Sequence, residues 1–280
     1  MEYVDAISSR FFTNTESCGM PIDYEKNRRV GRLLNHCCVR TVRATRYVTP
    51  LREGGSLPGL MEADDLGLYV VKFRGAGQGT LALVAEVIAG ELARALGFPV
   101  PEIVLVHVDS DLAAAEADPE IQDLIKASDG VNLGMDFLPG AFPFVPPVTS
   151  AFAADVVWFD ALIGNVDRTP KNPNLLNWHG RTWLIDHGAA LIAQHSASPL
   201  PESAQNGFPA ISNHVLIRFA GSILEAHERL ASLVTDPLLN ELVGLVPSDW
   251  FKNHPPQEYV EYIVNRVANQ GFAREAESAR

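Results

Sequence analysis

Three oxygen-bearing side chains in the second half of the sequence have a spacing that could support phosphoryl transfer. Asn172 lies five residues after Asp167, and Asp186 lies fourteen residues after Asn172. Transfer of a phosphoryl group requires a carboxylate that orients and deprotonates the acceptor hydroxyl, and hard oxygen ligands for the magnesium that bridges the nucleotide phosphates. The pattern makes these residues candidates for such a site, although an isolated Asp and Asn in a loop more often only form turns.

A lysine interrupts an apolar run in the first half of the chain. Lys72 lies within residues 66–73, where a charge costs free energy unless an opposite charge pairs with it. The segment that follows offers Glu86 and Glu91 as partners. A lysine paired in this way could contact nucleotide phosphates, whereas a lysine on an edge strand could simply extend into solvent.

Two glycine-rich segments flank this lysine. Gly54, Gly55 and Ser56 precede it, and residues 75–79 follow it. Either segment could bring backbone N–H groups close to phosphate, because glycine tolerates the dihedral angles that such loops need. We favour the first segment, because the loop that covers the phosphates in kinases precedes the strand that carries the lysine.

The candidate residues require a strand-rich region to meet a helical one. Apolar residues at helical spacing predict a helix over residues 81–97, and Asp118-Pro119 is a typical helix start. The first two predicted strands form a hairpin around the glycine-rich loop at residues 51–59. Strands are predicted near residues 39–51, 66–73, 103–108 and 131–138.

A segment with four prolines and one glycine, residues 139–147, separates the two regions. Beyond it, the pattern predicts a short hairpin of strands 174–178 and 182–186, which places Asp186 at the end of a strand. Helices are predicted near residues 150–164, 212–233, 237–245 and 256–270. We therefore predict an α+β fold in two lobes, with a tail at 1–36, a strand-rich N-lobe at 37–138, a hinge at 139–147 and a helical C-lobe at 148–280.

The composition argues against several classes of function. Of 280 residues, 47% are hydrophobic and 20% are charged, as in a globular protein. A net charge of −12 gives no electrostatic basis for general binding to nucleic acid or to an anionic membrane. No apolar run approaches the length of about 18 residues that a membrane helix needs, and the N-terminus lacks a signal-peptide pattern. Three cysteines form no disulfide framework, so we expect a cytoplasmic protein.

Taken together, these motifs resemble the HipA-like kinase family, serine/threonine kinases whose two-lobed fold is related to that of protein and phosphoinositide kinases. The resemblance spans about residues 40–270. Its most specific parts are the Asp167 loop and the lysine strand. The matching residues are 54–58, 69–73, Glu86 with 92–97, 165–172 and Asp186.

The resemblance implies a protein-kinase-like fold and a role for each matching residue. Asp167 would be the catalytic base, and Asn172 and Asp186 would hold Mg²⁺. ATP would be the phosphoryl donor, and the acceptor would be a Ser or Thr hydroxyl of a protein or, as the lesser alternative, a small molecule. The residues expected to bind the nucleotide are Gly54, Gly55, Ser56, Lys72 and Glu86.

Two positions depart from the family pattern. Thr169 stands where the catalytic loop commonly has His, and His187 stands where protein kinases have Phe. Two alternatives therefore stay open: a pseudokinase-like module that binds nucleotide without turnover, and a nucleotidyl transferase on the same fold. We expect no counterpart of the N-terminal subdomain of full-length HipA toxins, so an antitoxin partner is not assumed. From the order of the lobes, we expect the adenine contacts near residues 136–138.

Overall fold

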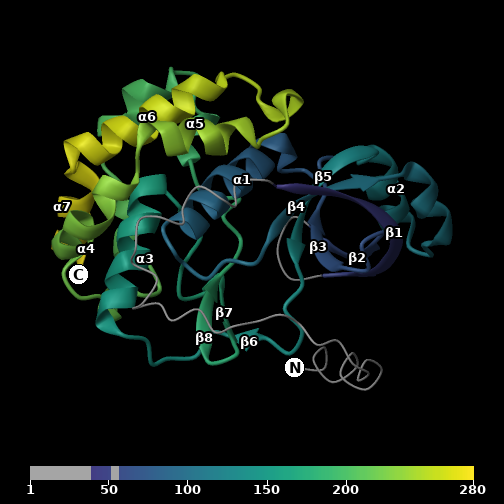
Figure 1. Cartoon of the computed structure of the whole chain (residues 1–280), viewed down its shortest axis with the longest axis horizontal. Coiled ribbons are helices and arrows are strands. Elements are labelled where there is room, and N and C mark those ends of the chain that lie inside the picture. The colour runs from purple at the N-terminus through teal and green to yellow at the C-terminus, as the bar shows by residue number, and fades with distance from the viewer. Residues whose placement is uncertain (1–38, 52–56) are drawn as a thin grey trace.

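The computed structural model describes residues 39–51 and 57–280, which form a strand-rich half and a helical half (Figure 1). The predicted α+β organisation is confirmed. The predicted tail at residues 1–36 and the predicted phosphate loop at Gly54, Gly55 and Ser56 lie outside the described residues.

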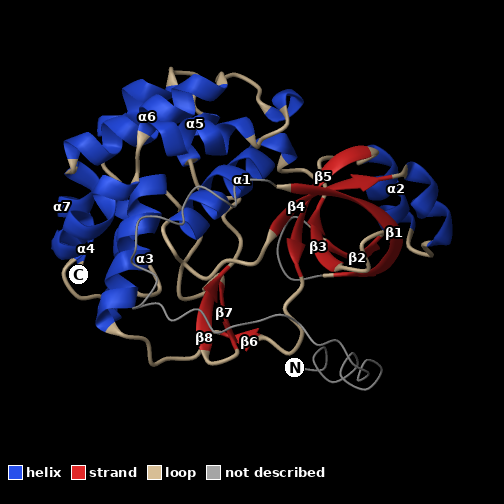
Figure 2. Ribbon diagram, viewed as in Figure 1, coloured by secondary structure: helices blue, strands red, loops and turns tan. Residues whose placement is uncertain are grey.

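The strand-rich half is a closed barrel in the order β1-β2-β3-β5-β4 (Figure 2). Parallel pairing of β1 with β4 closes it, whereas the other neighbours pair antiparallel. Small and β-branched side chains such as Val71, Val104 and Val106 fill its interior. The strands are β1 (Arg40–Pro50), β2 (Gly59–Ala63), β3 (Leu68–Lys72), β4 (Ile103–Val108) and β5 (Gly130–Asp136).

The predicted hairpin was wrong in one respect, because β2 lies between its two strands. β2 pairs with both β1 and β3, and its Leu60 and Met61 are almost fully buried. Only five residues long and preceded by Pro58, β2 is too short to show a period-2 pattern in the sequence. The next strand begins at Leu68 instead of Leu66, because Leu66 has a positive φ of 67° in the turn.

Two helices accompany the barrel. α1 (Gly79–Ala95) is apolar on nearly every face and lies between the barrel and the helical half (Figure 1). It ends at Ala95, and Gly97, the predicted helix stop, follows the C-cap residue Leu96 with a φ of 88°. α2 (Pro119–Ala127) starts where predicted, with the Asp118 side chain accepting a hydrogen bond from the backbone N–H of Glu120.

A three-stranded sheet in the order β6-β7-β8 follows the barrel. The strand β8 (Arg181–Leu184) ends two residues before Asp186, so the prediction that Asp186 ends a strand was wrong. With β7 (Leu175–Trp178), β8 forms the predicted hairpin. Its two-residue turn has a positive φ at both His179 and Gly180, as a type I′ turn requires. β6 (Phe142–Pro143) pairs with β7 and comes from the proline-rich segment, so the proposed hinge at 139–147 also contains a short strand.

The helical half surrounds α3 (Ser150–Ile163), which is buried on most faces and ends at Gly164 in the left-handed conformation. The other helices are α4 (Ile223–Leu230), α5 (Asp236–Gly244), α6 (Pro256–Asn269) and α7 (Gly271–Ala279).

Two predictions for the helical half were wrong. The helix predicted over 212–233 begins only at α4, because Ser222 caps the first turn and short 3₁₀ turns precede it. The chain also continues into α7, after a break at Gln270, where φ is 58°.

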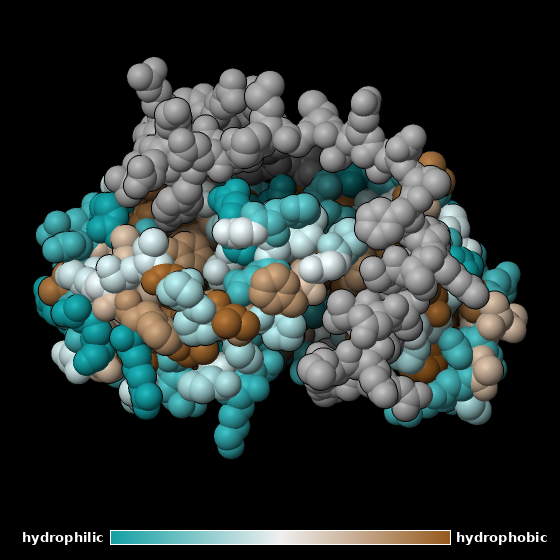
Figure 3. Space-filling view, turned by 90° about the horizontal axis from the view of Figure 1, so that it is seen from below, coloured by the Kyte–Doolittle hydropathy of each residue, from teal (hydrophilic) through white to brown (hydrophobic). Residues whose placement is uncertain are grey.

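None of the helices within residues 39–51 and 57–280 is both long enough and apolar enough to cross a bilayer. On the face drawn in Figure 3, hydrophobic side chains form small groups separated by hydrophilic ones.

Close packing inside the barrel predicts that Gly134 does not tolerate a side chain. A Cβ atom at this position would lie 2.5 Å from Val106 Cγ2 and 2.9 Å from Val104 Cγ2. Gly134→Ala should therefore lower the free energy of unfolding by about 1–3 kcal/mol, as overpacked cores do. Urea denaturation measures this loss. Gly244→Ala, which meets no atom within 4 Å, is the control and should leave stability unchanged or slightly raised.

Candidate active site

Three residues that the sequence singled out meet around one ammonium group. Lys72, the last residue of β3, donates to Oε1 of Glu86 on α1 and, at 2.7 Å, to Oδ1 of Asp186. Glu86 is fully buried, whereas the Asp186 side chain is 39% exposed. Glu91, the alternative partner, instead lies 3.5 Å from Arg94. The fold therefore joins the lysine strand, the first helix and the segment after β8 at a single point.

Burial and charge act against each other in this cluster. Burial alone would raise the pKa of Asp186, but the charge and hydrogen bond of Lys72 outweigh it and lower that pKa to about 2. Burial disfavours the ammonium form of Lys72, yet the two carboxylates raise its pKa. For Glu86, burial is the larger effect and raises the pKa despite the neighbouring ammonium. With one cation facing two carboxyl groups, the cluster favours a further cation.

Contacts with the helical half hold α1, and therefore Glu86, in place. The Thr80 hydroxyl donates to the carbonyl oxygen of Trp250 at 2.8 Å, and Gln194 donates to that of Leu81 at 3.2 Å. Both contacts are at the first turn of α1, and the rest of the helix contributes to the same hydrophobic core as α3. The position of Glu86 is thus determined by the helical half as well as by the barrel.

The other two predicted residues meet on the loop after α3. The Asn172 side chain donates to Oδ2 of Asp167 at 2.7 Å. The backbone N–H of Asp167 donates to Oδ1 of Asn165 at 3.1 Å. Thr169 and Asn172 exchange backbone hydrogen bonds, and the Thr169 hydroxyl accepts a third from the Asn172 N–H. The hydroxyl that replaces the family's His therefore shapes the loop itself.

Sequence reasoning missed the contact between Asn174 and Asp167. The Asn174 side chain donates to the same Oδ2 atom of Asp167 at 3.3 Å. The sequence pattern assigned Asn174 to the following strand, but its φ of 47° places it in the left-handed region, which Asn tolerates better than most residues. Its polar character just before an apolar strand was the available signal.

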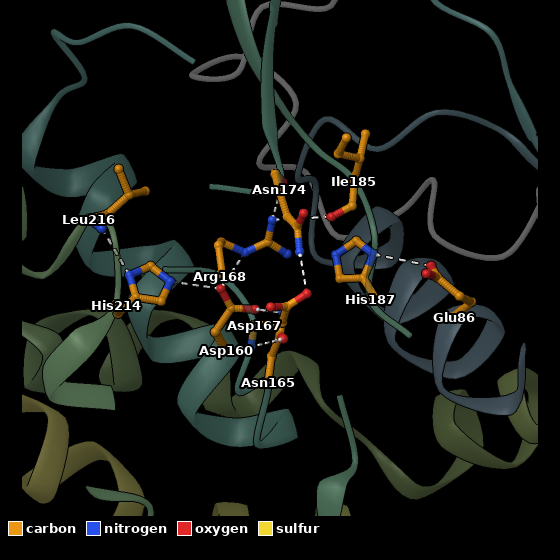
Figure 4. Close-up of polar contacts among 10 residues, drawn as sticks. All are labelled: Glu86, Asp160, Asn165, Asp167, Arg168, Asn174, Ile185, His187, His214 and Leu216. Atoms are coloured by element: carbon orange, nitrogen blue, oxygen red, sulfur yellow. Dashed lines mark hydrogen bonds and ion pairs between the residues drawn. The ribbon is translucent and has the colours of Figure 1, made fainter. Parts of the chain in front are cut away.

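A buried network behind the loop was also missed. Arg168 Nε donates to Oδ2 of Asp160 on α3 at 2.6 Å, and His214 Nε2 lies 2.8 Å from the same oxygen (Figure 4). All three side chains are nearly inaccessible to solvent. Burial would raise the pKa of Asp160, but the charge of Arg168 and the hydrogen bond with His214 lower it. Asp160 and Arg168 are therefore charged partners inside the protein.

His187, next to Asp186, packs beneath the site. Its ring is fully buried and meets the ring of Phe159 edge to face at 6.2 Å. His187 Nδ1 lies 3.9 Å from Oε2 of Glu86, and among the described residues neither ring nitrogen has a hydrogen-bond partner. Burial lowers the pKa of His187 to about 3.

No group of three His, Cys, Asp or Glu side chains within the described ranges is arranged to hold a metal ion by itself. The donors that fit a magnesium ion are the partly exposed Asp186 carboxylate and the amide oxygen of Asn172, whose NH₂ group faces Asp167. Both are hard oxygen ligands, and Mg²⁺ bound at nucleotide sites usually takes only one or two protein ligands besides phosphate oxygens and water. The residues therefore fit a metal that binds together with a nucleotide.

The barrel, the helical half and the cluster of Lys72, Glu86 and Asp186 are the features of a kinase-like phosphotransferase. The sequence model of the HipA-like kinases matches residues 45–277. The chain belongs to the HipA-like kinase family, as its motifs predicted.

One of two similar solved structures, that of CtkA, supports the kinase fold. The crystal structure of the proinflammatory kinase CtkA of Helicobacter pylori aligns with 14% sequence identity and a TM-score of 0.50, covering 85% of this chain and 98% of CtkA. The crystal structure of the Golgi casein kinase with Mn/ADP bound aligns with 14% identity and a TM-score of 0.48, covering 86% of this chain and 74% of that kinase. No curated protein matches the sequence significantly.

The neutral, buried ring of His187 predicts a loss of stability in acid. The unfolded state binds a proton below about pH 6.5, whereas the folded state binds it only below about pH 3. The stabilisation is therefore complete above pH 6.5 and is lost as the pH falls toward 3. At pH 5 the free energy of unfolding, measured by urea denaturation, should be about 2 kcal/mol lower than above pH 6.5.

His187→Gln removes this titration and should show a correspondingly smaller loss between pH 7.5 and pH 5. Replacement of the exposed His195 by Gln is the matched control and should keep the loss of the unmodified protein. An unchanged pH dependence in His187→Gln would contradict the assignment.

Proposed function

We propose that the protein transfers the γ-phosphoryl group of ATP, with Mg²⁺, to a Ser or Thr hydroxyl of a protein. The observation that carries this proposal is the convergence of Lys72, Glu86 and Asp186 from three separate elements on one ammonium group. A buried lysine held between two carboxylates is a costly arrangement for a fold that needs only stability. It suits a site that binds phosphate groups and a divalent cation.

In this proposal Asp167 is the catalytic base. The amides of Asn172 and Asn174 both donate to its Oδ2 atom, which orients the carboxylate. We assign Oδ1 to accept the proton of the acceptor hydroxyl, because Oδ2 already accepts two hydrogen bonds. The loop holds this geometry through hydrogen bonds of its own, before any substrate binds.

Lys72 would contact the nucleotide phosphates, and Glu86 would keep its ammonium group in place. Asn172 and Asp186 would hold Mg²⁺, and the ion would neutralise negative charge that develops on the phosphates. The lowered pKa of Asp186 keeps its carboxylate ionised over the whole physiological range, as a metal ligand must be.

The phosphate-covering role of Gly54, Gly55 and Ser56 remains a proposal on residues outside the described part. The alternative segment at 75–79 is less suitable, because three of its backbone N–H groups, those of Gly75, Ala76 and Gly79, already donate hydrogen bonds within the protein. Gly75 N–H donates to the Ser128 hydroxyl at 3.2 Å, and Gly79 N–H donates to the carbonyl of Ala76 at 2.9 Å.

Within residues 136–138, two of the three backbone N–H groups are already used in hydrogen bonds inside the protein. The Asp136 N–H donates to the carbonyl of Glu102, and the Phe137 N–H donates to that of Leu68. We therefore propose the Leu138 N–H as the backbone donor for the adenine edge. The lobe boundaries at 37–138, 139–147 and 148–280, and a cytoplasmic location, are likewise proposals.

The catalytic role of Asp167 predicts a selective loss of activity. Asp167→Asn should lower the rate of ³²P transfer from [γ-³²P]ATP to dephosphorylated casein, or to the chain itself, by about 10²-fold or more, because the amide cannot accept the proton. Thermal stabilisation by Mg·ATP should persist. Asp123→Asn, at an exposed carboxylate on α2, is the control.

Full activity of Asp167→Asn would overturn the assignment. Mass analysis of the product separates the alternatives: an added phosphate supports a kinase, an added AMP indicates a nucleotidyl transferase, and nucleotide binding without product indicates a pseudokinase.

The metal role of Asp186 predicts a nucleotide effect that depends on magnesium. At about a hundred times its dissociation constant, Mg·ATP should stabilise the folded protein by about 2.7 kcal/mol in a thermal shift assay. The gain should be smaller without Mg²⁺ and largely absent in Asp186→Ala. Asp249→Ala, which removes an exposed partner of Arg74, should keep it. An equal Mg²⁺-dependent gain in Asp186→Ala would place the metal elsewhere.

A further inference from the structure

The arginine that follows the proposed base has its guanidinium group inside the protein. Arg168 is adjacent to Asp167, yet its side chain is fully buried. From Nη1 the guanidinium donates to the carbonyl oxygens of Asn174 and, at 3.3 Å, of Ile185 (Figure 4). It therefore connects the loop after α3 to the chain on both sides of the β7–β8 hairpin.

Each of these carbonyl contacts lies next to a functional atom. Asn174 is the residue whose amide donates to Oδ2 of Asp167. Ile185 immediately precedes Asp186, the proposed metal ligand. A single guanidinium group thus joins the segments beside Asp167 and Asp186, although it contacts neither carboxylate.

Asp160 holds the guanidinium in turn. Its Oδ2 atom accepts from Arg168 Nε at 2.6 Å and lies 2.8 Å from His214 Nε2. The His214 Nδ1 atom accepts a hydrogen bond from the backbone N–H of Leu216 at 3.1 Å, so the ring proton must be on Nε2. His214 therefore donates to Asp160, and the backbone N–H of Val215 donates to the Arg168 carbonyl at 3.0 Å.

A second connection runs from Asp160 to the base itself. Asn165 donates from Nδ2 to Oδ1 of Asp160 at 3.1 Å, and Oδ1 of Asn165 accepts from the Asp167 N–H at 3.1 Å. Both oxygens of one carboxylate on α3 are thus used to fix the loop that carries Asp167.

We propose that Asp160 is a positioning residue for phosphoryl transfer: through Arg168 and Asn165 it fixes Asp167 relative to Asp186. The inference rests on the proposed function, which gives those two carboxylates their roles. A carboxylate is needed because a buried guanidinium requires a charged partner. Displacement of a reacting group by about 1 Å can reduce the rate about 10²-fold.

The test uses the full chain and a double variant that removes both buried charges, Asp160→Asn/Arg168→Met. Because no unpaired charge is left, it should be less destabilised than Asp160→Asn alone. The kcat for transfer to dephosphorylated casein should fall about 10²-fold, while KM for ATP stays within about threefold. A milder variant, His214→Phe, removes one donor to Asp160 and should lower kcat about threefold to tenfold.

Asp155→Asn is the matched control. Asp155 is on α3, as Asp160 is, but it pairs with Arg229 on α4, away from the loop that carries Asp167. It should lower stability and leave kcat unchanged. If the network were only structural, the double variant would behave in the same way, with kcat per folded molecule equal to that of the unmodified protein.

Hydrogen–deuterium exchange provides a readout that does not depend on activity. In the double variant, amides of residues 165–174 and 185–188 should exchange about tenfold faster or more, while those of α1 stay unchanged. Unchanged exchange in these segments, or faster exchange with an undiminished kcat, would overturn the positioning role. Faster exchange in a protein whose unmodified form transfers no phosphate would show that the network fixes these two segments, and it would reject the proposed function and with it the catalytic part of the positioning role.

Discussion

The structure depends on the burial of one ammonium group between two carboxylates. Lys72 is brought there by the barrel, Glu86 by a helix that is apolar on nearly every face, and Asp186 by the chain beyond the hairpin of the helical half. Without Lys72, the fully buried Glu86 carboxylate would lack a charged partner, which costs several kcal/mol, so β3 and α1 cannot separate here without a large loss. The same requirement brings the barrel and the helical half together at the candidate site.

A second ion pair, which is fully buried, joins elements behind the loop that carries Asp167. Asp160 and Arg168 are both inaccessible to solvent, in contrast to surface pairs such as Arg46 and Glu62, which contribute little. Arg168 uses Nε for Asp160 and Nη1 for two carbonyl oxygens, and its buried Nη2 has no hydrogen-bond partner among the described residues. The result is a loop whose shape is set by internal contacts and whose Asp167 carboxylate remains available for chemistry.

Several features could be read from the sequence because they depend on local physics. Asp118 before Pro119 identified the start of a helix, and Gly97 and Gly164 marked helix ends where the backbone turns left-handed. The strand β2 could not be read, because its burial results from pairing on both sides. The 3₁₀ turns before α4 were missed for a similar reason, since their apolar residues pack against α3 without forming a regular helix.

The sequence by itself determined the α+β class, the HipA-like family and the spacing of Asp167, Asn172 and Asp186, because these follow from the order and local preferences of residues. The family resemblance favoured Glu86 over Glu91 as the partner of Lys72, and in the tertiary structure Glu86 makes that contact. Only the tertiary structure decided that Asp160 lies behind the loop. Such contacts join elements that are distant along the chain. They depend on which face of a helix is turned toward the core, and neighbouring residues do not specify that.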